Sequence, residues 1–257
     1  AYMLMALVKD EGIERGLDSL FTESERVSRF GFTATELERQ KKDVLRSMER
    51  LYAERDKRES SAFAAEYQRH FLQAEPSPGA EVEFELHKRF LPEITLEETN
   101  KLGREWVTER NRVVMVSAPE KPGLQVPDGQ KLAAATKAVA GKDIKPYVDT
   151  VGDKPLLDKV PEPGKVVGTK TKEDVGITEW ELSNGVKVVF KPTNFKQDEI
   201  VFRAMSPGGT SLASDKDFIQ ASTASQVVAS GGVGKFNVIE LTKVLSGKVA
   251  KVRTYIC

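Results

Sequence analysis

The sequence lacks most of the residues on which metal and thiol chemistry depends. A single cysteine, Cys257 at the last position, allows neither an intramolecular disulfide nor a cysteine-rich zinc site in the 257 residues. A catalytic zinc needs about three converging ligands, but there are only two histidines, His70 and His87, and neither H-E-x-x-H nor H-x-x-E-H. They fall on different predicted helices, so we expect packing or surface roles for both. No G-x-S-x-G motif marks a nucleophilic serine, and Cys257 is not expected to be a nucleophile.

An excess of charge and a long apolar run are missing as well. Lys plus Arg total 39 and Asp plus Glu total 39, whereas nucleic-acid binders depend on clustered positive charge. No run approaches the roughly 20 apolar residues that a membrane helix needs. We therefore expect no nucleic-acid partner and no membrane partner. Hydrophobic residues make up 39% of the chain, which is sufficient for a packed core.

Residues 1–118 are rich in helical patterns. Apolar residues recur at helical spacing in five segments, which are residues 13–30, 37–51, 63–71, 82–90 and 96–107. Gly31 is a natural stop for the first segment. Two segments open with a capping box, in which a threonine and a glutamate bond the free amides of the helix start: Thr33 with Glu36, and Thr95 with Glu98. The fourth segment also alternates as a strand would, so a strand stays an alternative there, and RVVMV at 112–116 is predicted to be a strand.

Residues 119–175 change character and are predicted to be a long extended linker. Proline recurs at seven positions, with glycines between them. Each X-Pro pair disfavours helix, and proline cannot donate a hydrogen bond to a sheet. One short helix, which Asp128 caps and which runs from Gln130 to Val139, interrupts this linker.

Residues 176–257 are predicted to begin a second unit. Residues 177–193 read as a β-hairpin, because Asn184-Gly185 accepts the positive φ angles of a tight turn. The elements expected after it are a strand (199–206), a helix (216–230), a helix that Asn237 and Glu240 cap, and a closing strand (248–256). The order β-β-β-α-α-β makes the predicted fold class α+β, with a helix-rich first part, a Pro-rich linker, then a β-hairpin plus helices. An open sheet leaves an unpaired edge, which predicts self-association.

GGVGK at residues 231–235 raises the question of a phosphate-binding loop. A Walker loop needs a glycine five positions before its last glycine, a Ser or Thr after the lysine, and a strand before the loop. Here Ala229 stands where the first glycine is needed, Phe236 stands where Ser or Thr is needed, and the motif follows a predicted helix. A glycine helix stop is the favoured interpretation. From the residues alone, no catalytic, cofactor-binding or metal-binding residue is predicted in this chain.

Two long stretches resemble a known peptidase family. FTESERVSRFGFTATELERQKKDVLRSMER, followed by FLPEIT, resembles the second domain of insulinase/pitrilysin-type zinc peptidases. WELSNGVKVVFKPTNFKQDEIVFRAMSPGGTSLA, then ASQVVASGGVGKFNVIELTKVLSGK, is similar to the opening of the third domain in bacterial single-chain members. The resemblance implies pieces of metallopeptidase-like α/β sandwiches: the helix-rich part of the second domain at 1–118, the interdomain linker at 119–175, and the start of the third, inactive domain at 176–257.

The resemblance also implies where the chemistry lies. In this family two halves enclose an unfolded peptide, and zinc sits only in the first domain, on an H-x-x-E-H helix plus a later glutamate. The glutamate inside the motif activates the zinc-bound water. The implied zinc is therefore in the first domain of a parent protein, with no cofactor in this segment. Residues 221–230, which include neither His nor Glu, would form the counterpart of the zinc helix.

Three functional hypotheses follow. The first is a non-catalytic segment of a zinc-dependent metalloendopeptidase that helps enclose and position a peptide or unfolded protein substrate, with the remaining domains of the same chain as partners. The second is a zinc-free scaffold subunit that pairs with a catalytic peptidase, and the third is a nucleotide-binding module at GGVGK. The N-terminal stretch has no basic segment or cleavage site and reads as a helix cut open, so we expect a piece of a longer protein. The resemblance favours a bacterial periplasmic or otherwise exported protein.

Overall fold

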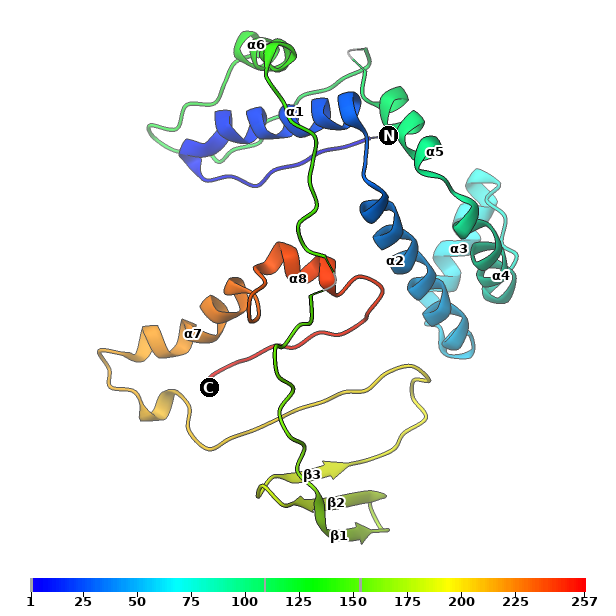
Figure 1. Cartoon of the computed structure of the whole chain (residues 1–257), viewed down its shortest axis with the longest axis vertical. Coiled ribbons are helices and arrows are strands. Elements are labelled where there is room, and N and C mark those ends of the chain that lie inside the picture. The colour runs from blue at the N-terminus through cyan, green and yellow to red at the C-terminus, as the bar shows by residue number, and fades with distance from the viewer. Residues whose placement is uncertain (1, 109, 153) are drawn as a thin grey trace. The chain divides into compact units, whose positions relative to one another are not determined.

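The computed structural model describes residues 2–108, 110–152 and 154–257. Helices and a small antiparallel sheet form its regular structure, so the predicted α+β class is confirmed (Figure 1). The chain divides into two compact units, residues 1–41 with 89–152, and residues 42–88 with 153–257. Within the described part of the chain, no helix is both long and apolar enough to cross a membrane.

All five helices expected in the first 118 residues are confirmed, and the ambiguous fourth segment is a helix. Their bounds are α1 Ile13–Phe30, α2 Ala34–Ala53, α3 Ser60–Gln73, α4 Ala80–Phe90 and α5 Leu96–Trp106. The helix expected in the linker is α6, Gly129–Ala138, and α7 and α8 span Phe218–Gly231 and Val238–Val244. Short 3-10 turns lie at 10–12, 55–57, 91–93, 139–141 and 210–212.

Local caps explain why these helices begin and end where they do. Gly31 ends α1 with a φ of 73°, and its N–H donates to Val27 O at 2.8 Å. Both predicted threonine capping boxes form. In the second, the Thr95 N–H donates to the Glu98 carboxylate at 2.8 Å, and the Glu98 N–H donates to the Thr95 hydroxyl oxygen at 3.2 Å. Such reciprocal bonds satisfy amides that a helix start leaves without partners.

The sheet has three antiparallel strands in the order β1-β2-β3, with bounds Val166–Lys172, Ile177–Leu182 and Lys187–Phe190. The predicted hairpin is β2-β3. Its turn is closed by a bond from Gly185 N to Leu182 O (2.8 Å) and one from Leu182 N to Val186 O (2.9 Å). Gly185 has a φ of 80°, whereas Asn184 is not among the residues with positive φ. The turn therefore needs only one left-handed residue, not the two expected.

Three predicted strands are wrong. Residues 112–116, 199–206 and 248–256 form no strand and pair with none among the described residues. Apolar and β-branched residues favour a strand in a segment, but a strand also requires a partner to bond its backbone groups. A strand that was not predicted, β1, forms instead after the last proline of the linker. The observed order of the C-terminal part is thus β-β-β-α-α, without the closing strand.

The residues of the predicted linker that follow α6 lie along α1. The guanidinium of Arg29 donates to the carbonyls of Lys142 (2.9 Å) and Ala140 (2.8 Å), and that of Arg26 donates to Lys145 O. Apolar side chains are buried in the same unit, where α1 packs against α5 and α6; they are Ile13, Leu17, Val139, Ile144 and Val151. Arginines of α1 therefore bond carbonyl groups that an extended segment cannot pair with itself.

Candidate functional site

The GGVGK stretch forms a tight turn at the end of α7. Gly232 has a φ of 95°, and its backbone lies so close to Phe236 O that a side chain would collide with it. Val233 and Phe236 bond each other through both backbone pairs, at 2.9 and 3.0 Å. Phe236 is only 5% exposed. The glycines thus let the chain reverse and bury an aromatic ring, which supports the helix-stop interpretation.

The lysine of this stretch faces a carboxylate. Lys235 Nζ lies 2.7 Å from Asp158 Oδ2, and both side chains are largely exposed. A phosphate loop would instead direct its lysine and its backbone N–H groups at one anion. The arrangement gives no support to the nucleotide-binding hypothesis.

The histidines and the cysteine do not meet. His70 Nδ1 lies 2.7 Å from Glu75 O, and His87 Nδ1 lies 2.7 Å from Glu83 O, so each ring bonds a backbone carbonyl near its own helix. Cys257 is exposed and free. Among the residues that the structure describes, no three His, Cys, Asp or Glu side chains are grouped so that they could hold a metal ion.

Several carboxylates accept hydrogen bonds that lower their pKa. Asp149 is the clearest case, since its side chain is 8% exposed and ion-paired with Arg39. Burial alone would raise the pKa of Asp149, but hydrogen bonds from Arg39, Thr35 and the Val151 N–H outweigh it and lower the pKa to about 2. A general acid or base needs a pKa near the working pH. Asp149 therefore has a structural role and anchors the segment after α6 to α2.

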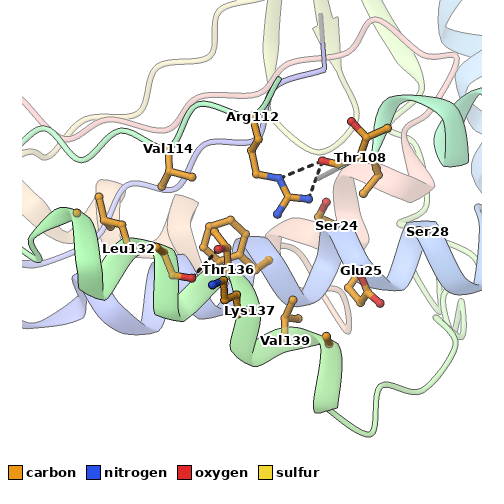
Figure 2. Close-up of a pocket in the computed structure, with 15 residues that line it drawn as sticks. Ser24, Glu25, Ser28, Thr108, Arg112, Val114, Leu132, Thr136, Lys137 and Val139 are labelled. Atoms are coloured by element: carbon orange, nitrogen blue, oxygen red, sulfur yellow. Dashed lines mark hydrogen bonds between the residues drawn. The ribbon is translucent and has the colours of Figure 1, made fainter. Parts of the chain in front are cut away.

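A cavity of about 870 Å³ lies between α1 and α6 (Figure 2). Its apolar side chains come from both helices and from the extended segment after α5, and its polar ones are mostly hydroxyls. The lining includes Phe21, Ser24, Ser28, Thr108, Arg112, Val114, Leu132, Thr136, Lys137 and Val139. These residues come from three separate stretches of the sequence and share no motif, so the sequence alone does not single them out.

Arg112 and Lys137 carry the positive charge of this cavity. Figure 2 shows the Arg112 guanidinium directed toward the space between α1 and α6. Nε and Nη2 both donate to Thr108 O, at 3.2 and 2.9 Å, which leaves further N–H groups that no described acceptor bonds. The acidic residue of the lining, Glu25, is already paired with Arg29 at 2.7 Å. The cavity can therefore accept a carboxylate together with apolar groups.

Comparisons with known proteins find relatives among zinc proteases. No family model matches the sequence. A zinc protease PQQL-like protein of Arabidopsis thaliana is 28% identical over 211 residues, which is 82% of this chain and 22% of that protein. The probable zinc protease PqqL of Haemophilus influenzae is 25% identical over 168 residues, which is 63% of this chain and 18% of that protein. The chain is a partial relative of insulinase/pitrilysin-type zinc proteases.

The match covers only a part of these zinc proteases, because the chain spans about one fifth of the length of the curated relatives. Two solved structures are also similar. The periplasmic protease PqqL from Escherichia coli has a TM-score of 0.45 and 17% identity, over 92% of this chain and 26% of that one. The ferredoxin protease FusC, solved with Arabidopsis ferredoxin, has a TM-score of 0.48 and 20% identity, over 91% and 26%.

Proposed function

We propose that this chain is a non-catalytic segment of a zinc-dependent metalloendopeptidase and that it helps to enclose and position the peptide substrate. Two curated relatives named as zinc proteases support the reaction class. The domain division expected from the sequence (1–118, 119–175 and 176–257) is part of this proposal, as is a zinc site in another domain of the parent protein. The cavity between α1 and α6 is the observation that carries the substrate role.

The lining of the cavity suits an unfolded peptide. Hydroxyl groups such as Ser24 and Thr136 can bond peptide N–H and C=O groups without demanding a sequence. Leu132 and Phe21 offer apolar contacts to side chains. Arg112 can bind a carboxylate through two N–H groups, which suits an acidic side chain or a free C-terminus.

The test is the affinity of this chain for a fluorescein-labelled, unstructured peptide with a free C-terminal carboxylate, measured by fluorescence anisotropy. Arg112→Glu is expected to weaken binding at least about tenfold, because it replaces a charge-assisted bond with repulsion. Arg203→Glu is the matched control, since Arg203 is exposed and lies outside the cavity lining. Equal affinity of the Arg112 variant and the control would rule the cavity out as the peptide site.

The partners and the location follow from the same proposal. We infer a peptide or unfolded protein as the substrate, the remaining domains of the parent chain as partners, and an exported protein, as the family resemblance implies. Self-association through an open sheet edge stays a prediction. In the described residues β1 and β3 are both edge strands, and each leaves backbone groups available for pairing.

A further inference from the structure

Charged side chains of α2 and of the turn that follows it bond two distant segments of the chain. We call the set the α2 stripe; its members are Asp43, Arg46, Glu54 and Lys57. Arg46 lies three residues after Asp43, which is close to one helical turn of 3.6 residues. Glu54 and Lys57 lie eleven and fourteen residues after Asp43, close to three and four turns, in the turn that follows α2. All four, and both segments that they bond, belong to the same compact unit, 42–88 with 153–257.

The first bound segment is the loop at 194–198. Glu54 Oε1 accepts two consecutive backbone N–H groups, from Gln197 at 2.6 Å and from Asp198 at 2.9 Å. The carboxylate of Asp198 in turn lies 2.6 Å from Arg46 Nη2. Lys57 adds a bond to the carbonyl of Asn194. The loop is thus held by side chains at both of its ends.

The second bound segment is the turn after α8. Asp43 Oδ1 accepts the Ser246 hydroxyl at 3.0 Å and the Gly247 N–H at 2.5 Å. Gly247 has a φ of 76°, and a Cβ there would lie 3.0 Å from Lys42 Cβ, so the turn approaches α2 closely. Asp43 therefore bonds the backbone of this turn as well as a side chain.

The carboxylate of Glu54 is buried and therefore needs the N–H groups of the loop as hydrogen-bond donors. Glu54 is 9% exposed, and its Oε2 is buried without a hydrogen-bond partner among the described residues. The backbone N–H of Asp198 lowers the pKa of Glu54 despite the opposing effect of burial, and the N–H of Gln197 and the charges of Lys196 and Lys57 lower it further. A buried carboxylate is costly unless donors surround it, so the loop N–H groups and Glu54 depend on each other.

We propose that the α2 stripe is a polar interdomain contact, by which the second domain holds the beginning of the third. In the proposed domain division α2 lies in residues 1–118, whereas both bound segments lie in residues 176–257. The compact unit 42–88 with 153–257 crosses this division, since it contains both sides of the contact. The inference rests on that division and not on peptide binding. The contact consists of ion pairs and hydrogen bonds, and such polar domain interfaces are typical of domains that can separate. High salt should therefore weaken it, because Arg46 and Asp198 are about one third exposed.

Hydrogen exchange measured by mass spectrometry on the whole chain tests this contact. In the wild type, the backbone amides of residues 194–199 and 246–249 are expected to exchange their hydrogens more slowly than the amides of an unstructured peptide of the same sequence. Glu54→Ala should raise exchange at least about tenfold at 194–199 and leave 246–249 unchanged. Asp43→Ala should do the opposite, with its effect at 246–249.

A charge swap separates the contact from general destabilisation. Arg46→Asp should raise exchange at 194–199, and adding Asp198→Arg should restore most of the protection. Arg203→Asp is the matched control and should leave both peptides as in the wild type. Free-peptide exchange at 194–199 in the wild type, or no recovery in the Arg46→Asp/Asp198→Arg double variant, would overturn the proposal. Since neither readout involves a bound peptide, a failure of the cavity proposal would not produce these results.

Discussion

Asp149→Asn is expected to lower the free energy of unfolding by about 2 kcal/mol at neutral pH, which corresponds to the shift of its pKa from 3.8 to about 2. Asp149 Oδ2 accepts the Thr35 hydroxyl at 2.8 Å and pairs with Arg39, and Oδ1 accepts the Val151 N–H at 3.3 Å. The asparagine keeps the shape and loses the charge. Equilibrium unfolding in urea measures the difference.

The acid dependence of stability gives a second readout of the same group. The pKa of Asp149 is lower in the folded than in the unfolded chain, so its contribution is fully present above about pH 4 and is lost as the pH falls through about 2. The Asn variant should lack this loss. Asp143→Asn is the control, because Asp143 is 82% exposed and its pair with Lys145 should contribute at most about 1 kcal/mol. Equal effects of the two substitutions would contradict a buried anchor at Asp149.

Gly31→Val should destabilise the chain by about 3 kcal/mol, through two effects that act at one residue. Gly31 has a φ of 73°, which a β-branched residue adopts only with strain. A Cβ there would also lie 2.5 Å from the Asn100 side chain, whose Oδ1 accepts the Phe32 N–H at 2.7 Å. The substitution therefore forces either the helix end or this bond to give way.

Thermal unfolding of two further variants separates these effects. Gly129→Ala should leave stability unchanged or raise it by up to about 1 kcal/mol, because Gly129 is helical and a Cβ at this position would have no neighbour within 4 Å. Combining Gly31→Val with Asn100→Ala should remove the collision and leave the backbone strain. A Gly31→Val protein as stable as Gly129→Ala would show that neither constraint exists.

The helices were predictable because their signals are local. The Asn237-Glu240 box, for example, names a helix start within four residues, and the structure forms both of its bonds, each at 3.0 Å. Gly31 likewise marks the end of α1 by its own conformation. Neither signal depends on what lies elsewhere in the chain.

The strands were less predictable because pairing is not local. Residues 199–206 contain β-branched and aromatic residues as β2 does, yet among the described residues β2 has a strand on either side and 199–206 pair with none. β1 was assigned to the linker because prolines dominate that region, although residues 166–172 contain none. The average composition of residues 119–175 predicts a linker, whereas residues 166–172 pair with β2 as an antiparallel strand.

In the candidate site, too, local features were predictable and features that depend on packing were not. Sequence motifs correctly favoured a turn at GGVGK, where Gly232 and Phe236 define the geometry. The cavity was not predicted, because Arg112, Ser24 and Leu132 come together only through the packing of α1 against α6. The family was recognised from two long stretches, and the curated relatives confirm it.

The zinc content of this chain and of its parent protein decides whether the chain is a non-catalytic segment of a zinc peptidase. It should be measured by inductively coupled plasma mass spectrometry on this chain and on the longest protein that its gene encodes, both after exhaustive dialysis. We expect about one zinc ion per molecule in the longer protein, as a catalytic site requires, and none retained by this chain. Stoichiometric zinc in this chain, or no zinc in the longer protein, would contradict it, and the latter result would favour the zinc-free scaffold instead.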